Sequence, residues 1–357
     1  MLRWEAVLNL RNLDRDELAA AVAPFGVGPE LAGRIFARVH RDGAAGLPPG
    51  AVRGLPHAAA AALEAAATWP ELEVMERRRA ADGFVKYLFR TADGHAIEAV
   101  RIPLPDPEAA RALRARRRAG QAAPLEALPA AKYTLCVSSQ VGCALACAFC
   151  ATGRLGGIRS LKTWEILAQH RLVAAEADHP VRGVVFMGMG EPLLNYENVV
   201  RAARILSDPA GAAISAKAIS ISTAGVLPAI RRFTAEGHHF RLILSLGAPT
   251  SASGGRVTLA YVVIGGVNAT PGHARALGAL LGDLRVKLNL IDVTDDTGRY
   301  RRATPEELAA FRDALDALGV PVVRRYSGGA DIGAACGTLA ATRTGGDLVA
   351  LARPPIA

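Results

Sequence analysis

The chain of 357 residues has little of several features, and each shortage excludes a class of protein. It has only five cysteines, an odd number with three in one short stretch, unlike the framework of a secreted, disulfide-held domain. No uncharged run is long enough to span a bilayer, because the alanine stretch from Ala58 is interrupted by Glu64. The first residues contain no apolar core of signal-peptide length. We therefore expect a cytoplasmic protein that makes no use of a membrane.

Aromatic residues are also scarce, at 5%, whereas alanine, glycine, arginine and proline are abundant. This composition indicates a GC-rich coding bias, which weakens any argument from alanine-rich helices. With 51% hydrophobic residues, the chain can form one large domain of α/β-barrel size and a small one. The formal charge of +9 favours a polyanionic partner such as RNA, although a basic surface kept for solubility explains it equally well.

Three of the cysteines, Cys143, Cys147 and Cys150, lie close together in the chain. Three thiolates at this spacing can hold three corners of an iron–sulfur cube, and the fourth iron is then open to a small molecule with an amine and a carboxylate. A zinc site would need a fourth ligand, and no histidine lies near enough in the sequence to provide one. The spacing therefore predicts an iron–sulfur cluster in preference to three idle cysteines.

Residues 1–80 are predicted to form a helical accessory domain. Asp14 to Glu17 has the pattern of a capping box, Pro29 is suited to the first turn of a second helix, and a third helix runs through the alanines to Trp69. Three arginines of this region are suited either to RNA phosphates or to a solvated face: Arg34, Arg38 and Arg41.

A β-hairpin and a basic linker are predicted over residues 81–132. Two alternating runs, Phe84–Phe89 and His95–Ile102, flank the turn signal Asp93-Gly94. The stretch that follows, before Tyr133, contains five clustered arginines: Arg111, Arg114, Arg116, Arg117 and Arg118. A basic helix on an RNA backbone and an exposed insertion without that role both fit this composition.

Residues 133–345 alternate short apolar runs with helical patterns, which is typical of parallel β/α units. We therefore predict an α/β fold, a partial (β/α)6 barrel of the TIM type, followed by a C-terminal tail at 346–357. Seven runs are predicted to be strands: Tyr133–Ser138, Gly183–Met187, Ala218–Ser222, Arg241–Ser245, Val257–Ile264, Val286–Ile291 and Pro321–Arg325.

Polar or glycine-rich motifs follow the first four of these strands. The C-terminal rim of a β/α barrel is where chemistry is done, and glycines there let a backbone approach a ligand closely. One such motif alone would usually be a tight turn, but four in register predict a ligand site beside the cluster. The motifs are the cysteine loop, Gly188-Met-Gly190-Glu191-Pro192, Ser222-Thr-Ala-Gly225 and Ser245-Leu246-Gly247.

These motifs resemble those of the radical S-adenosylmethionine superfamily, and three longer stretches are similar to the RlmN/Cfr adenine methyltransferases. The resemblance covers most of the chain from about Asp82 to Ala341, and a small helical N-terminal domain also fits the family. All five cysteines fall on family positions. The three stretches are Thr134-Leu-Cys136-Val-Ser-Ser-Gln-Val-Gly-Cys143, Val185-Phe-Met-Gly-Met-Gly-Glu-Pro-Leu-Leu-Asn195 and Ala334-Ala-Cys336-Gly-Thr-Leu339.

The resemblance implies a [4Fe-4S] cluster on Cys143, Cys147 and Cys150, with S-adenosyl-L-methionine at the open iron. It implies that Cys336 accepts a methyl group. A 5′-deoxyadenosyl radical would then take a hydrogen from this methyl group, and the resulting carbon radical would add to adenine. Cys136 would then attack the Cys336 sulfur, and a transient disulfide bond would release the base. Glu98 falls on the family's proton acceptor; without the family it would be taken for an exposed strand residue.

Six cofactor contacts carry over from the family: Gly190, Glu191, Ser222, Ser245, Leu246 and Gly247. The chain departs from the family pattern at four places near them. Relatives have histidine at Gly247 and asparagine near Thr294, a longer connection at Thr250–Gly255, and an arginine near Ser327. These departures change the walls around the substrate more than the radical machinery.

The implied function is methylation of an adenine carbon, C2 in preference to C8, in 23S rRNA or tRNA. The implied partners are RNA and an electron donor such as flavodoxin or ferredoxin, and we expect a monomer. An enzyme of the same mechanism on a non-RNA substrate is the alternative, which the position of the arginines relative to the barrel mouth would discriminate. A degenerate RNA-binding or iron–sulfur protein has no chemical reason to keep both Cys136 and Cys336.

Overall fold

The computed structural model describes residues 8–118, 129–245, 257–282, 286–295, 297–325 and 328–340. Several predictions fall on other positions and so lie outside the described residues: those for Leu246, Gly247, Thr250–Gly255, Ser327 and the tail at 346–357. The same holds for the side chains of Arg114, Arg116, Arg117 and Arg118 in helix α4 (Pro107–Arg118).

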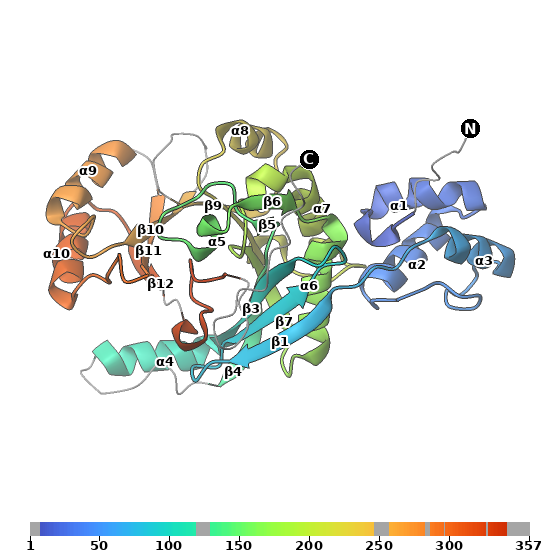
Figure 1. Cartoon of the computed structure of the whole chain (residues 1–357), viewed down its shortest axis with the longest axis horizontal. Helices are drawn as coiled ribbons and strands as arrows, with labels where there is room; N and C mark the ends of the chain where they lie inside the picture. Colours follow the sequence, from blue (N-terminus) through green and yellow to red (C-terminus); the bar gives the residue numbers. More distant parts are fainter. Residues whose placement is uncertain are drawn as a thin grey trace.

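The N-terminal domain contains helices α1 (Arg15–Val22), α2 (Pro29–His40) and α3 (His57–Ala66) (Figure 1). The predicted capping box at Asp14 and Glu17 is confirmed. The domain's core includes Ile205 of helix α7 (Tyr196–Ser207), so the domain packs directly on the barrel. Its arginines Arg34, Arg38 and Arg41 pair with nearby carboxylates, as on a solvated face.

The helical domain ends earlier than predicted. Residues Glu73–Arg79 form strand β1, which pairs antiparallel with strand β2 (Val85–Arg90). The run of charged residues in β1 has little strand pattern of its own, and it becomes a strand because β2 presents a free edge to it. The prediction of helix up to residue 80 is therefore wrong for this segment.

The predicted hairpin is confirmed. Strand β2 pairs antiparallel with β3 (Ala96–Pro105) around a turn in which Gly94 has φ +84°. Strand β3 then pairs antiparallel with the first barrel strand, β4 (Ala130–Cys136), so the hairpin extends the barrel sheet.

All seven predicted parallel strands are present. The sheet has ten strands in the order β1-β2-β3-β4-β7-β8-β9-β10-β11-β12, with β1 and β12 at its edges, so the barrel is open as predicted. After β4 the parallel strands are β7 (Val181–Phe186), β8 (Ile219–Thr223), β9 (Arg241–Ser245), β10 (Val257–Val263), β11 (Val286–Asp292) and β12 (Val322–Arg325).

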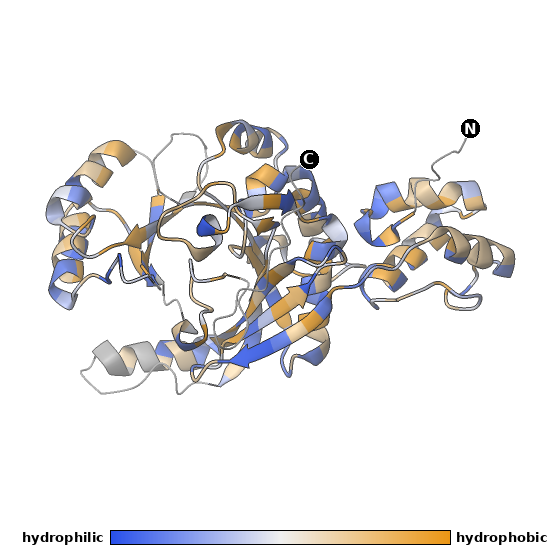
Figure 2. Cartoon of the chain, viewed as in Figure 1, coloured by the Kyte–Doolittle hydropathy of each residue, from blue (hydrophilic) through white to orange (hydrophobic). Residues whose placement is uncertain are grey.

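Helices cover the outer, convex face of this sheet (Figure 1): α6 (Thr163–Glu176), α7, α8 (Leu227–Ala235), α9 (Pro271–Leu281) and α10 (Pro305–Asp316). Outward-facing strand residues such as Leu135, Val184 and Leu288 are fully buried in one core with Phe311 of α10. The helices carry hydrophobic and hydrophilic residues together, and strand β1 is largely hydrophilic (Figure 2). The concave face is lined by smaller and more polar residues, and it holds the site described next. Within the described residues, every helix is too short or too polar to cross a membrane.

Candidate active site

The three clustered cysteines lie in the loop between strand β5 (Gln140–Gly142) and helix α5 (Ala151–Arg154). Strand β5 pairs with β6 (Gly157–Ser160), so the loop is closed by a short two-stranded ribbon. The Cys143 N–H donates to the Gly156 carbonyl at 2.8 Å. The structure contains no disulfide bond between Cys136 and Cys336, the pair expected to form one transiently.

Glycines allow this loop to fold tightly on itself. A Cβ at Gly142, which has φ +70°, would lie 1.9 Å from the Gly156 carbonyl oxygen. A Cβ at Gly153 would lie 2.8 Å from the Cys147 nitrogen. Ala146, between the first two cysteines, adopts a left-handed conformation with φ +48°, which is uncommon for a residue with a side chain. Close packing at these glycines therefore fixes the backbone conformation of the loop that carries the cysteines.

The electrostatics of the loop suit an iron–sulfur cluster. Burial raises the pKa of the Cys143 and Cys147 thiols, and the negative charge of neighbouring thiolates raises it further. Positively charged iron would relieve this repulsion between thiolates. Among the described residues no three His, Cys, Asp or Glu side chains converge on one metal ion, as a mononuclear zinc site would require. The three cysteines of a cube bind three different irons and need no such convergence.

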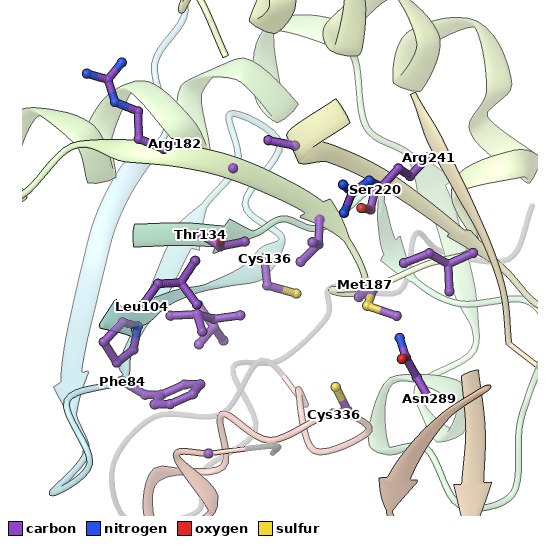
Figure 3. Close-up of a pocket in the computed structure, with 18 of the residues that line it drawn as sticks. Phe84, Leu104, Thr134, Cys136, Arg182, Met187, Ser220, Arg241, Asn289 and Cys336 are labelled. Atoms are coloured by element: carbon purple, nitrogen blue, oxygen red, sulfur yellow. The ribbon is translucent and has the colours of Figure 1, made fainter. Parts of the chain in front are cut away.

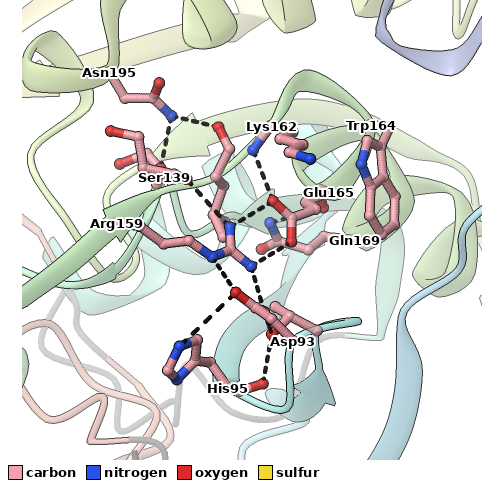
Figure 4. Close-up of polar contacts among 12 residues, drawn as sticks. Asp93, His95, Ser139, Arg159, Lys162, Trp164, Glu165, Gln169 and Asn195 are labelled. Carbon is pink, nitrogen blue, oxygen red and sulfur yellow. Dashed lines mark hydrogen bonds and ion pairs between the residues drawn. The ribbon is translucent and has the colours of Figure 1, made fainter. Parts of the chain in front are cut away.

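Arg159 anchors the ribbon that carries this loop (Figure 4). Its guanidinium lies 2.6 Å from Asp93 in the hairpin turn and 2.8 Å from Glu165 of α6. Hydrogen bonds from Arg159 hold the pKa of Asp93 well below its usual range. Glu165 is only 2% exposed, so the arginine also neutralises a buried carboxylate.

Asn195 holds the same ribbon from the other side (Figure 4). It lies three residues after the Gly188-Met-Gly-Glu-Pro192 motif. Its amide donates to the carbonyls of Ser139 at 2.8 Å and Leu161 at 2.7 Å, just outside the two ribbon strands. Asn195 thereby fixes the position of the motif after β7 relative to the cluster loop.

The glycines of the motif lie against the segment that leads into the cluster loop. A Cβ at Gly188 would lie 2.6 Å from the Val137 carbonyl oxygen, and one at Gly190 would lie 2.5 Å from the Gln140 side chain. Gly190 has φ +97°, a conformation that glycine adopts readily. Side chains at either position would push the motif away from the cluster loop.

Glu191 lies at the end of this motif and is buried. One carboxylate oxygen accepts from the Leu193 N–H at 2.9 Å and the other from the Ala224 N–H at 2.8 Å. Burial raises its pKa, and these backbone donors oppose that effect. Glu191 therefore braces the loops after β7 and β8, a role that sequence patterns did not indicate.

Two hydroxyls meet at the neighbouring strand ends. The side chains of Ser222 on β8 and Ser245 on β9, both predicted cofactor contacts, are 2.9 Å apart. After β11, the Thr294 hydroxyl is buried and has no hydrogen-bond partner among the described residues. Buried hydroxyls are rarely left unpaired, so Thr294 is suited to bind a ligand at this rim.

The segment that carries Cys336 is fastened between the cluster loop and the hairpin. On the cluster side, Ala151 N–H donates to the Gly337 carbonyl at 2.7 Å, and the Thr152 hydroxyl donates to the Leu339 carbonyl at 2.6 Å. On the hairpin side, Asp82 accepts from the Gly329 N–H at 2.9 Å. These bonds join Cys336 to a cluster loop almost 190 residues earlier in the chain.

Glu98, the expected proton acceptor, is fully buried on β3, so an exposed strand glutamate is excluded. Its carboxylate lies 3.1 Å from Lys86 Nζ and accepts from the Ala340 N–H at 3.1 Å. Lys86 also donates to the Gly333 carbonyl at 3.3 Å. Sequence reasoning missed Lys86, although a lysine within the apolar run Phe84–Phe89 was a usable signal.

Cys136 and Cys336 meet in a cavity of about 820 Å³ on the concave face of the sheet. They are 200 residues apart in the sequence, yet their sulfur atoms point toward one another across the cavity (Figure 3). Met187 and Asn289 line the same space. The structure thus brings together the two outer cysteines that the sequence placed far apart.

Comparison with known proteins gives consistent matches. The Radical SAM superfamily pattern matches residues 137–252. A probable RNA methyltransferase from Myxococcus xanthus is 47% identical over 96% of this chain and 97% of its own length. A dual-specificity RNA methyltransferase RlmN from Anaeromyxobacter sp. is 34% identical over 98% of this chain and 94% of its own. The crystal structure of a radical SAM methyltransferase from Sphaerobacter thermophilus superposes with a TM-score of 0.78, at 33% identity, over 94% of this chain and 100% of that one.

Proposed function

Because the chain belongs to the RlmN/Cfr-like radical S-adenosylmethionine RNA methyltransferases, we propose that it methylates a ring carbon of an adenine in RNA. The observation that carries this proposal is the cavity onto which Cys136 and Cys336 both open, next to the loop of Cys143, Cys147 and Cys150. The family resemblance favours C2 over C8, and 23S rRNA as the target with tRNA as a second one.

The loop cysteines would hold a [4Fe-4S] cluster, which together with S-adenosylmethionine supplies the radical that activates an unreactive methyl group. The chain's own residues do the rest. The Cys336 thiolate accepts the methyl group and presents it to the adenine carbon in the cavity. Glu98 takes the proton that leaves that carbon. Cys136 then attacks the Cys336 sulfur, so that an S–S bond forms as the carbon–sulfur bond to the product breaks.

Contacts to S-adenosylmethionine are assigned to the strand ends around the cysteine loop. The backbone at Gly190 and Glu191 and the hydroxyls of Ser222 and Ser245 match the family's positions, as do Leu246 and Gly247 in the sequence. Thr294, whose hydroxyl is buried without a partner among the described residues, would replace the family's asparagine.

Turnover by this route needs one electron per radical, from a donor such as flavodoxin or ferredoxin. It also needs the Cys136–Cys336 disulfide to be reduced after each cycle. Both needs place the enzyme in the cytoplasm, where thiols are kept reduced, and a monomer suffices for the chemistry.

Mass spectrometry of RNA nucleosides tests the proposal directly. Ribosomal and transfer RNA from cells with and without the gene are digested and compared, with a Cys336→Ala strain as the matched control. We expect 2-methyladenosine to be lost in both the deletion and the Cys336→Ala strain. Loss of 8-methyladenosine instead would assign the other carbon. No change in either nucleoside would contradict RNA as the substrate and favour a non-RNA compound.

A further inference from the structure

The cavity that contains the two outer cysteines has a strongly asymmetric charge. Six basic residues line it, and none of the described lining residues is Asp or Glu. The chain as a whole has 33 acidic residues against 42 basic ones, so the described lining is far more one-sided in charge than the whole chain. The six are Lys132, Arg182, Lys217, Arg241, Lys287 and Arg324.

Five of the six lie at one end of the barrel, whereas Arg324 is the third of the four residues of β12. Arg182 is the second residue of β7, Arg241 the first of β9 and Lys287 the second of β11. Lys132 is the third residue of β4, and Lys217 lies two residues before the start of β8. Because the strands are parallel, their starts share one edge, which we name the N-terminal rim. The cluster loop and the predicted cofactor contacts lie at the opposite edge.

Three of these residues project onto the concave face itself. Side chains alternate along a strand, so Lys132 shares a face with Cys136, Arg241 with Ile243, and Lys287 with Asn289. All three partners line the cavity. These three charges therefore line the cavity near the strand starts, whereas Cys136 is the last residue of β4.

Most of these cations are unneutralised. Arg324 pairs with Asp292 at 2.7 Å. For the other five, the described part of the chain provides no carboxylate within ion-pair distance. Some arginines elsewhere in the described chain are paired, for example Arg15 with Asp208 and Arg201 with Glu17. Converging cations repel one another unless an anion lies between them.

We propose that the N-terminal rim binds the phosphates of the RNA and that the target adenine enters the cavity from this side. The inference rests on the proposed function and adds its entry route. Enzymes that modify a base extrude it from its stack, while lysine and arginine hold the flanking backbone. The cavity wall also includes apolar side chains, and among them Phe84, Val185 and Ile243 are available to contact the base. RNA and S-adenosylmethionine would then reach Cys336 from opposite ends of the barrel.

A pair of charge-matched variants tests the rim. The rim variant is Lys132→Gln, Arg241→Gln, Lys287→Gln. The control is Arg231→Gln, Arg275→Gln, Arg312→Gln, which removes three exposed arginines from the outer helices α8, α9 and α10. The reconstituted holoenzymes are titrated with a fluorescent RNA hairpin that has an unpaired adenine in its loop. Both variants have the same net charge, so non-specific attraction is equal.

We expect the rim variant to bind the hairpin at least about tenfold more weakly than the control at moderate salt. Its plot of log affinity against log salt should be less steep by about 2, since each phosphate contact on a single strand contributes about 0.7. Methyl uptake by Cys336 without RNA should stay within about twofold of wild type, because the rim is remote from the predicted cofactor contacts. Each single substitution should show a smaller loss of affinity, which keeps the test valid if the triple variant misfolds.

Equal affinities of the rim and control variants would overturn the proposal. So would competition by adenosine monophosphate at concentrations equal to those of the hairpin, since the rim would then bind a single phosphate and no RNA strand. Failure of the proposed function is a separate result: the wild-type enzyme would then leave RNA unmethylated, whatever the binding comparison shows.

Discussion

Lys86 and Glu98 form a buried ion pair, with Lys86 Nζ 3.1 Å from a Glu98 carboxylate oxygen and side-chain exposures of 3% and 0%. They face each other from adjacent strands of the hairpin. Each also bonds to the Cys336 segment, Lys86 to the Gly333 carbonyl and Glu98 to the Ala340 N–H. The pair therefore holds the proposed proton acceptor and both ends of the methyl-carrying segment together.

Lys86→Met should lower the free energy of unfolding by about 3 kcal/mol, because it leaves a buried carboxylate without a positive partner. It should also slow RNA methylation. The double variant Lys86→Met, Glu98→Gln should recover most of the stability, since no charge is then left buried, but not the activity. Urea denaturation and a methylation assay measure the two effects. A Lys86→Met protein as stable as wild type would show that the pair is dispensable.

Cys147→Ser should abolish the brown iron–sulfur absorbance after anaerobic reconstitution, because a hydroxyl is a poor ligand for iron of the cluster. Cys136→Ser is the matched control, since Cys136 lies in the cavity and outside the cluster loop, and it should keep the full absorbance. Undiminished absorbance in Cys147→Ser would remove this cysteine from the cluster.

Cys336→Ala should abolish uptake of labelled methyl from S-adenosylmethionine by the protein, because the accepting thiolate is gone. Cys136→Ala should still take up methyl but fail to release product, so that protein covalently joined to RNA accumulates on a denaturing gel. Continued labelling of Cys336→Ala would reassign the methyl acceptor, and free turnover of Cys136→Ala would remove the need for a disulfide.

Thr294→Val should weaken S-adenosylmethionine binding by about 2- to 10-fold, the value of one hydrogen bond, with little change in stability. The reason is that the Thr294 hydroxyl is buried without a partner in the described structure, so its removal breaks no bond within the protein. Thr294→Ser keeps the hydroxyl and should bind normally in equilibrium dialysis. A loss of stability with unchanged affinity would give the hydroxyl a structural role.

Acid should destabilise the N-terminal domain through His40. Burial lowers its pKa to about 4, and its ring lies 3.1 Å from the Leu13 carbonyl. The unfolded side chain titrates near 6.5, so between these values only the unfolded state takes up the proton. Stability is then lost as the pH falls, by about 2 kcal/mol from pH 7 to pH 5. Hydrogen exchange of α2 amides measures this, and His40→Gln should flatten the dependence.

The sequence alone determined the parts of this protein that depend on local pattern. These parts are the seven parallel strands, the helices between them and the capping box at Asp14. Each was predicted because it depends on a pattern of neighbouring residues. The cysteine loop was equally readable, since its ligands are within eight residues of one another. The family resemblance extended this to Cys136, Cys336 and Glu98.

Only the tertiary structure decided which distant residues meet. Strand β1 forms because β2 offers an edge, and Lys86 matters because Glu98 and the Cys336 segment close around it. The basic rim is spread over strands from Lys132 to Lys287, and nothing in the spacing of these residues shows that they line one cavity. Such a site forms because the starts of parallel strands lie along one edge of the assembled sheet. No single stretch of sequence shows which residues meet there.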